Sequence, residues 1–514
     1  FIILQFAMEP IVNMIQSIST DNGRFVANAH TIIKVFQVVI LFPFSKLIVK
    51  LACLCVPGED KKINYRESYQ LKYIGEKVTV CGWVRTSRES KTMAFAELND
   101  GTSLKHLQIV IDRENLEYPQ TSLRLGTALK VEGTVVEARQ GGVEINAEVI
   151  EVLGECPLDY PLQKKRHTLE FLRTIPHLRT RTNTFNAVFR VRSVMAGAIH
   201  RYFQDRGYTY VNAPIITGSD CEGAGEMFRV TTHPFNHEYK TEEEYYENDF
   251  FGKKAGLSVS GQLEGEVAAM AFGKIYTFGP SFRAENSNTP RHVAEFWHVE
   301  PEVAFAELPD IIEIAEDMIK TIIKDTMDAC PEELAFFDKH FEKGLIDKLN
   351  KIISDKFEVL DYTKAIEILK ESGKEFVYPV EWGCDLQTEH ERYITEEVFN
   401  KPVFIINYPK DIKSFYMKQN PDGKTVAATD LLVPGVGEII GCSEREADLD
   451  KLLDAMKARG MREEDYVDYI ELRKFGSVPH SGFGLGFERI LMYVTGISNI
   501  RDLILYPRTV GNVR

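Results

Sequence analysis

Apolar and polar residues alternate in short runs across residues 63–152, from VTVCGWVRT through MAFAELND and LKHLQIVID to VEINAEVIEVLG. A period of two is typical of strands with one buried face, and Gly or Asp-Gly turns separate the runs. Five such strands predict a small closed β-barrel. We favour an OB-fold over another five-stranded module because aromatic and basic residues suited to single-stranded nucleic acid lie together: Trp83, Arg85, Arg88 and Phe95.

After Thr182 the pattern changes to helices and strands. AVFRVRSVMAGAIHRYFQDRG repeats apolar residues at helical spacing, and YTYVNAPIIT, which contains Pro214, predicts a strand. Residues 255–305 are predicted to form strands and turns. LPDIIEIAEDMIKTIIKDTM carries Pro309 near its start and an Ile/Met stripe, which predicts an amphipathic surface helix.

The charged segment 326–400 is predicted to be helical and to decorate the main sheet. The patterns together predict an α+β multidomain protein with an N-terminal extension over 1–58, the barrel over 59–158, a basic hinge over 159–181 and a larger domain over 182–514. From Tyr160 to the end of this hinge, six lysines and arginines stand against one acidic residue, Glu170. Two interpretations of it stay open, a solvated linker and a contact for a phosphate backbone.

Residues 1–58 share no pattern with the rest of the chain. VFQVVILFPFSKLIVKLACLCV is apolar, but Pro43, Lys46 and Lys50 interrupt it, so it would make a poor membrane-spanning helix. Three interpretations stay open: an upstream segment absent from the mature protein, a membrane-associated or targeting segment, and a small added domain.

Composition narrows the function class. The formal net charge of −15 argues against a general polyanion binder but leaves room for a local basic patch. The eight cysteines form no CxxC pair, which disfavours a zinc site. Their sparse distribution predicts reduced, mostly buried thiols of a cytoplasmic protein.

The segment FRAENSNTPRHVAEFWHVEPE predicts a hairpin with the groups that a nucleotide needs. Arg283 and Glu285 are expected on one face of its first strand, Arg291 and His292 after a polar loop, and Phe296 on the second strand. Arginines bind phosphates, an aromatic ring stacks on a base, and a carboxylate accepts from an exocyclic amine. A surface hairpin with salt bridges is the alternative.

The segment ATDLLVPGVGEIIGCSERE places Asp430 and Glu438 on either side of a Pro-Gly bend, with Arg445 a few residues on. The two carboxylates are expected to face one another on adjacent strands. Such a pair suits Mg²⁺, which keeps waters and takes few protein ligands, although two isolated acids are more often solvated.

The segment GFGLGFER lacks the third glycine of a dinucleotide-binding loop, because Phe487 stands at that position. Apolar residues at helical spacing predict a buried helix that starts near Phe487 and carries Arg489 in its first turn. A cation there opposes the helix dipole, which suggests an anionic ligand. We expect the glycines to let the strand and the start of the helix pass close to that ligand.

Three segments of the chain resemble motifs of the class II aminoacyl-tRNA synthetases. FRAE…RH is similar to motif 2, the predicted helix and strand with Pro214 are similar to motif 1, and GLGFER is similar to motif 3. The resemblance runs from about residue 63 to 514. A barrel ahead of the catalytic domain is typical of the aspartyl, asparaginyl and lysyl subclass. DFFGKKAGLSVSGQLEGE and VPHSGFGLGFERILMYVTGISNIRDLILYPR look most like the asparaginyl members.

The resemblance implies a role for each matching residue. Arg283 and Arg489 would be catalytic, and the residues that bind ATP would be Arg283, Glu285, Arg291, His292, Phe296, Glu438, Gly486 and Arg489. Mg²⁺ would lie on Asp430 and Glu438. The amino acid would contact Glu222, Glu226, Gln262 and Arg445. The anticodon would contact Trp83, Arg85, Phe95 and Gln108, and Pro214 would lie at a homodimer interface.

The choice of amino acid depends on charge. Aspartyl relatives neutralise the substrate side chain with an arginine and a lysine. Arg445 stands at the arginine position, but the lysine position falls on Gly265. The side-chain carboxylate of aspartate would therefore lack one compensating cation, whereas the neutral amide of asparagine needs none. Glu226 is the candidate acceptor for the amide nitrogen.

The resemblance thus implies an asparagine–tRNA ligase that uses ATP and Mg²⁺ to activate L-asparagine and to charge tRNA(Asn), without a membrane partner. Two alternatives remain. One is an aspartyl enzyme, including a non-discriminating one, and the other is a non-catalytic synthetase-like binding protein.

Overall fold

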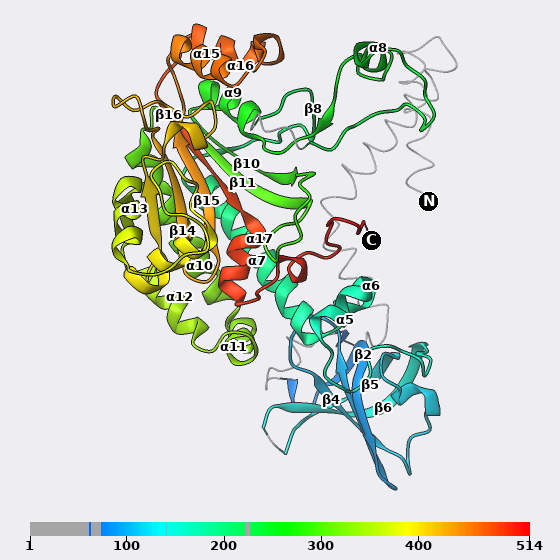
Figure 1. The fold of residues 1–514 in the computed structure, drawn as a ribbon. Helices are drawn as coiled ribbons and strands as arrows, with labels where there is room; N and C mark the ends of the chain where they lie inside the picture. Colours follow the sequence, from blue (N-terminus) through cyan, green and yellow to red (C-terminus); the bar gives the residue numbers. More distant parts are fainter. Residues whose placement is uncertain (1–60, 63–72, 140, 222–226, 514) are drawn as a thin grey trace, which may run out of the picture. The chain divides into compact units, whose positions relative to one another are not determined.

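The computed structural model describes residues 61–62, 73–139, 141–221 and 227–513, and the chain divides into two compact units after Tyr160 (Figure 1). The three interpretations of residues 1–58 concern a segment outside the described residues. Among the described residues, no helix is both long and apolar enough to cross a bilayer.

The first unit contains the predicted barrel. Its strands are β1 (Lys61–Lys62), β2 (Lys77–Glu89), β3 (Met93–Asn99), β4 (Leu107–Asp112), β5 (Ala128–Glu137) and β6 (Val143–Gly154). The order β2-β3-β4-β6-β5 closes because β5 also pairs with β2, and β4 runs parallel to β6. This is the topology of the OB-fold, as predicted.

Alternation along the barrel strands produces the core of this unit. In β3 and β4 every second residue is buried: Ala94, Ala96, Leu98, Leu107, Ile109 and Ile111. Most of their neighbours in sequence are more exposed, although Asn99 and Val110 are buried as well. The barrel thus has an apolar interior and a more polar outer surface. The periodicity that predicted the strands is therefore the periodicity of burial.

The second unit is built on an eight-stranded sheet of order β12-β13-β14-β15-β16-β11-β10-β7. Its strands are β7 (Thr209–Tyr210), β10 (Lys274–Phe282), β11 (Glu295–Ala304), β12 (Glu358–Asp361), β13 (Val403–Ile406), β14 (Ala428–Val433), β15 (Gly437–Glu444) and β16 (His480–Gly486). Neighbours from β13 to β10 are antiparallel, and the two outermost pairs are parallel. A separate hairpin pairs β8 (Ile216–Thr217) with β9 (Gly256–Leu257).

The second unit also contains the helices, several of which pack on this sheet. They are α5 (Leu169–Thr174), α6 (Pro176–Arg179), α7 (Asn183–Asp205), α8 (Glu242–Glu247), α9 (Gln262–Phe272), α10 (Leu308–Ala329), α11 (Pro331–His340), α12 (Leu345–Ser354), α13 (Tyr362–Glu371), α14 (Thr388–Arg392), α15 (Leu449–Ala458), α16 (Val467–Lys474) and α17 (Phe487–Thr495). Helix α10 packs on α7 and on β15 and β16, and α7 lies beside α17 (Figure 1). Helix α9 packs on β10 and β11. The predicted helices over α7 and α10 are confirmed.

The prediction of strands and turns over 255–305 is wrong for α9. Its buried face carries Gln262 and Glu266 beside Leu263 and Ala269. Polar residues on the inner face hide the helical period of hydrophobicity, and they are tolerated because they bond to one another and to neighbouring elements. The helix that the pattern missed also contributes Gln262 to the candidate site described below.

Two further predictions need correction. YTYVNAPIIT forms only the short strands β7 and β8, and residues 211–215 between them lie outside both strands. Pro214 has no N–H for a ladder bond and restrains the residue before it. Segment 326–400 is mostly helical as predicted, but its strand β12 extends the main sheet by pairing with β13.

The basic stretch before α7 belongs to the second unit. Arg173 donates from Nε and Nη2 to Asp502 at 2.9 and 2.5 Å, and the fully buried Arg179 lies 3.5 Å from the same carboxylate. Arg179 also donates to the carbonyl of Arg501 at 3.1 Å. These two arginines therefore hold the C-terminal segment, while Lys164, among others, is exposed.

Replacing Asp502 with alanine should lower the free energy of unfolding by about 3–5 kcal/mol, because two arginines lose a buried partner. Chemical denaturation followed by circular dichroism measures this loss. Asp325→Ala is the matched control, since Asp325 is 36% exposed in its ion pair with Arg201 and should cost under about 1 kcal/mol. Equal losses in the two variants would contradict a structural role for the Asp502 cluster.

Candidate active site

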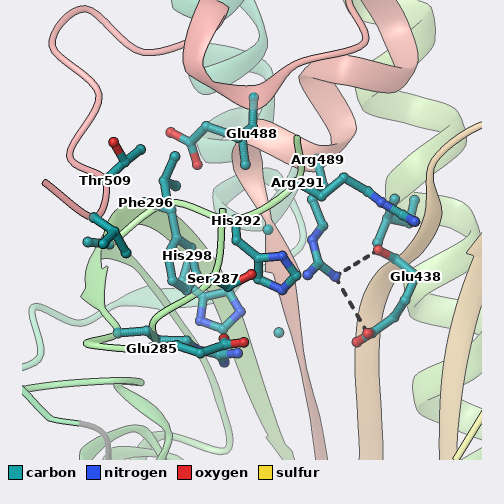
Figure 2. Close-up of a pocket in the computed structure, with 18 residues that line it drawn as sticks. Glu285, Ser287, Arg291, His292, Phe296, His298, Glu438, Glu488, Arg489 and Thr509 are labelled. Atoms are coloured by element: carbon teal, nitrogen blue, oxygen red, sulfur yellow. Dashed lines mark hydrogen bonds and ion pairs between the residues drawn. The ribbon is translucent and has the colours of Figure 1, made fainter. Parts of the chain in front are cut away.

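A polar cleft lies over strands β11, β15 and β16 and consists of two lobes. The smaller lobe has a volume of about 800 Å³ and the larger one about 1370 Å³. Both are lined by Arg283, His298, Glu438 and Gly484, so they form one continuous site. Figure 2 shows the smaller lobe with side chains from the β10–β11 connection on one side and Arg489 and Glu438 on the other.

The predicted hairpin is present, but the strand β10 ends at Phe282. Arg283 and Glu285 therefore lie in the β10–β11 connection and not on a strand face. Both line the smaller lobe, and the Arg283 guanidinium lies 5.4 Å from the ring of Phe296 on β11. The structure thus brings a cation, a carboxylate and an aromatic ring to one wall, as the sequence predicted.

Arg291 is held by two contacts outside its own hairpin. It donates to the carbonyl of Val436 and, at 2.6 Å, to the hydroxyl of Thr388 on α14. Burial lowers the pKa of this arginine. His292 lies beside it with its Nδ1 2.5 Å from Thr289 Oγ1, and burial lowers its pKa too. Both residues line the smaller lobe.

Arg489 lies in the first turn of α17, as predicted, and helix α17 begins at Phe487. Its Nη1 donates to the carbonyl of Glu438 at 2.9 Å and lies 3.5 Å from the carboxylate of that residue. Dashed lines in Figure 2 mark both contacts. The side chain remains 26% exposed, toward the smaller lobe. Gly486 also lines this lobe.

Two glycines of β16 leave space for side chains of the neighbouring strand. A Cβ at Gly484 would lie 2.6 Å from Nε2 of His298, and a Cβ at Gly482 would overlap the carboxylate of Glu302. Both partners come from β11, which pairs with β16. Gly482 and Gly484 therefore leave room for Glu302 and His298 over β16, a role that the sequence did not predict. Gly484 and Gly486 also line the smaller lobe, where the sequence predicted that glycines let the chain pass close to a ligand.

Asp430 and Glu438 lie on the adjacent strands β14 and β15, as predicted. Their carboxylates flank Gly441, with Glu438 Oε1 3.2 Å and Asp430 Oδ1 3.8 Å from the position a Cβ would take there. Lys413 contacts Asp430 at 2.5 Å. Burial raises the pKa of Asp430, whereas at Glu438 Arg489 and Lys413 outweigh burial and lower its pKa.

Arg445 lies buried in the wall of the larger lobe. Its Nε and Nη2 donate to both oxygens of Glu302 at 3.2 and 2.5 Å, and its Nη1 donates to Ser443 at 2.7 Å. Gly265 lies beside the side chain of Glu302, because a Cβ there would lie 3.4 Å from Cγ of Glu302. Gln262 lines the lobe from the first turn of α9.

Several cleft residues escaped the sequence analysis. His298, Glu300 and Glu302 follow Phe296 at intervals of two on β11, and all three line the larger lobe. Strand alternation from Phe296 could have found them. Lys413 and Asp385 also line this lobe from loops, and Glu391 lines it from α14. No local pattern in the sequence marked these three residues.

The remaining predicted residues lie elsewhere. Pro214 borders a small cavity with Tyr210 and Ile215, which are 42% and 43% exposed. Glu222 and Glu226 fall outside the described residues.

On the barrel, the outer face carries the residues that the sequence singled out. Arg88 stacks on Phe95 at 4.6 Å and lies 3.4 Å from Gln108 Oε1, while Trp83 is 42% exposed. The pairing of β2 with β3 shifts by one residue at Arg85. Trp83, Arg88 and Phe95 nevertheless share one face.

Comparisons with known proteins agree with this geometry. The family described as tRNA synthetases class II (D, K and N) matches residues 168–510, and the OB-fold nucleic acid binding domain matches residues 78–153. An asparagine–tRNA ligase from Bacillus cytotoxicus is 57% identical over 457 residues, covering 88% of this chain and 98% of the relative. The corresponding ligase from Clostridium kluyveri is 55% identical over the same shares.

Solved structures lead to the same family. The asparaginyl-tRNA synthetase of Pyrococcus horikoshii, complexed with asparaginyl-adenylate, superimposes with a TM-score of 0.79 at 33% identity, over 88% of this chain and 99% of that one. The enzyme of Entamoeba histolytica in complex with asparaginyl-adenylate gives 0.76 at 29% identity, over 89% and 99%. The chain therefore belongs to the class II tRNA synthetases of the aspartyl, lysyl and asparaginyl group, with an OB-fold ahead of the catalytic domain.

Proposed function

We infer that this chain is an asparagine–tRNA ligase, which activates L-asparagine with ATP and transfers it to the 3′ end of tRNA(Asn). The observation that carries the choice of amino acid is the Arg445–Glu302 ion pair next to Gly265. Glu302 already neutralises Arg445, and the position that holds a lysine in aspartyl relatives is Gly265 here. An amide can accept from Arg445 without adding a charge, whereas a carboxylate would add one to a buried site.

The chemistry needs few groups from the protein. The asparagine carboxylate attacks the α-phosphorus in line, pyrophosphate leaves, and asparaginyl-adenylate stays bound. We assign Arg283 to the α-phosphate and the substrate carboxylate, because it lines both lobes. Arg489 takes the outer phosphates, so two fixed cations stabilise the charge that develops in the transition state.

The other walls of the cleft supply orientation. Glu285 accepts from the adenine amine and Phe296 stacks on the base, while Arg291 and His292 contact the phosphates. Gln262 binds the α-ammonium of the amino acid, together with Glu222, and Glu226 accepts from the side-chain amide. All the described members of this set line one lobe or the other, which supports the assignment.

Asp430 and Glu438 fit a magnesium ion. Their hard oxygen atoms flank Gly441 on adjacent strands, and among the described residues no cluster of three or more His, Cys, Asp or Glu residues offers a closed protein cage for a metal. A two-carboxylate site open to a substrate is typical of Mg²⁺. When bound there, the ion would neutralise phosphate charge.

The partners follow from the two units. Trp83, Arg85, Phe95 and Gln108 are proposed to read the anticodon, because stacking rings and polar groups share the outer face of the barrel. The exposed side chains around Pro214 are proposed to meet a second copy of the chain. The six described cysteines are free thiols, which supports action in a reducing compartment such as the cytoplasm.

Pyrophosphate exchange into ATP tests the function. Purified protein should catalyse exchange that depends on asparagine, with kcat/KM for aspartate lower by about 100-fold or more, since an uncompensated buried charge costs several kcal/mol. Exchange with aspartate and not asparagine would instead assign an aspartyl enzyme. Absence of exchange with either amino acid would favour a non-catalytic binding protein.

A further inference from the structure

Glu266 is a buried carboxylate that the proposed chemistry does not use. It lies on α9 one turn after Gln262 and is fully buried. Its Oε1 accepts from Gln262 Nε2 and from the hydroxyl of Tyr469, both at 2.9 Å. Its Oε2 accepts from Arg473 at 2.8 Å and lies 2.9 Å from His480 Nε2. Four polar groups therefore contact one carboxylate within hydrogen-bond distance, and Arg445 Nε lies 3.9 Å from its Oε1.

The groups around Glu266 are themselves anchored. Arg473 on α16 donates to the carbonyl of Glu446 at 2.9 Å and to the Tyr469 hydroxyl at 2.8 Å. His480 on β16 has its Nδ1 2.8 Å from the carbonyl of Val478. Although burial opposes a charge on Glu266, Arg473 and His480 outweigh it and lower its pKa. Glu266 is thus an ionised acceptor fixed from two elements beyond its own helix.

This arrangement determines which way the Gln262 amide faces. An ionised carboxylate only accepts hydrogen bonds, so Gln262 must present its NH₂ group to Glu266. The carbonyl oxygen of a planar amide then lies on the opposite side. Gln262 lines the larger lobe, whereas Glu266 is not among the described residues that line either lobe. The amide therefore offers an acceptor to the lobe.

We propose that Glu266 is a positioning residue, which orients the Gln262 amide so that its carbonyl oxygen accepts a hydrogen bond from the α-ammonium group of the amino acid substrate. The proposal rests on the proposed function and deepens it. Without Glu266, a free amide could turn its NH₂ group to the lobe and repel the ammonium. The helix spacing of four residues makes the pair a rigid unit of α9.

A double-mutant cycle tests this role. Glu266→Gln keeps the shape but allows the Gln262 amide to turn, and it should raise KM for asparagine about ten-fold in pyrophosphate exchange, as expected for losing one hydrogen bond to a charged group. KM for ATP should stay within about two-fold, because a change confined to the ammonium contact leaves nucleotide binding unaffected. In a Gln262→Ala background, Glu266→Gln should have no further effect on KM for asparagine.

The control and the contrary outcomes are distinct. Glu333→Gln removes another buried carboxylate, which lies near Arg190 and outside both lobes, and it should leave both KM values unchanged. An unchanged KM in Glu266→Gln, or an equal rise in both backgrounds, would overturn the proposal. If Glu266→Gln does not fold, Glu266→Asp keeps the charge, shortens the arm and should raise the same KM. Failure of the wild type to use asparagine would refute the proposed function instead.

Discussion

Replacing Arg489 with alanine is expected to lower asparagine-dependent pyrophosphate exchange by about 1000-fold, the scale of losing a cation aimed at transition-state charge. The structure places its guanidinium at the wall of the smaller lobe, 2.9 Å from the Glu438 carbonyl and partly exposed to the cleft. The residue does not stabilise its helix, because a cation in the first turn opposes the dipole. Folding should therefore be unaffected.

Two further variants sharpen this test. Arg489→Lys keeps the charge but loses the forked geometry, so it should recover only part of the exchange. Arg462→Ala removes an exposed arginine, 73% exposed beside Asp465, and should leave exchange unchanged. Thermal unfolding by circular dichroism confirms that each variant is folded. Exchange within ten-fold of the wild type in Arg489→Ala would contradict the phosphate-binding assignment.

Replacing Arg445 with methionine is expected to have two effects of different origin. Asparagine activation should fall below detection, because the side-chain amide loses its donor. The free energy of unfolding should also fall by about 3–5 kcal/mol, since Glu302 loses a bidentate partner inside the protein. Pyrophosphate exchange measures the first effect and denaturant unfolding the second.

The double variant Arg445→Met/Glu302→Gln separates recognition from stability. Removing both charges together leaves no unpaired carboxylate, so most of the lost stability should return. Exchange should not return, because the donor to the substrate is still absent. A double variant that activates asparagine normally would show that Arg445 is not the residue that recognises the side chain.

Charge explains why these two arginines differ. Arg489 is partly exposed and contacts mainly a backbone carbonyl, so it is available to a ligand. Arg445 is buried and already paired, so it adds little net charge to the larger lobe. A phosphate chain suits the first environment and a neutral amide suits the second. The smaller lobe is thus suited to the phosphates of ATP, and the larger lobe to the side chain of asparagine.

Local patterns in the sequence determined most elements and many of the site residues. Alternation over 77–154 was sufficient for the barrel, and the helical start at Phe487 was sufficient to place Arg489 in a first turn. Asp430 and Glu438 were expected on adjacent strands and lie there. These features succeed because burial periodicity and turn chemistry are local properties of the chain.

Tertiary structure alone decided the rest. Helix α9 was missed because its buried face is polar. Glu266 is acceptable there because Arg473, Tyr469 and His480 contact it from distant elements, and Gln262 because it donates to Glu266. Gly482 and Gly484 of β16 are required because the side chains of Glu302 and His298, on the neighbouring strand β11, occupy the space that a Cβ would take. Such long-range partners leave no periodic signal, since hydrogen bonds and charge compensation depend on which segments the fold brings together.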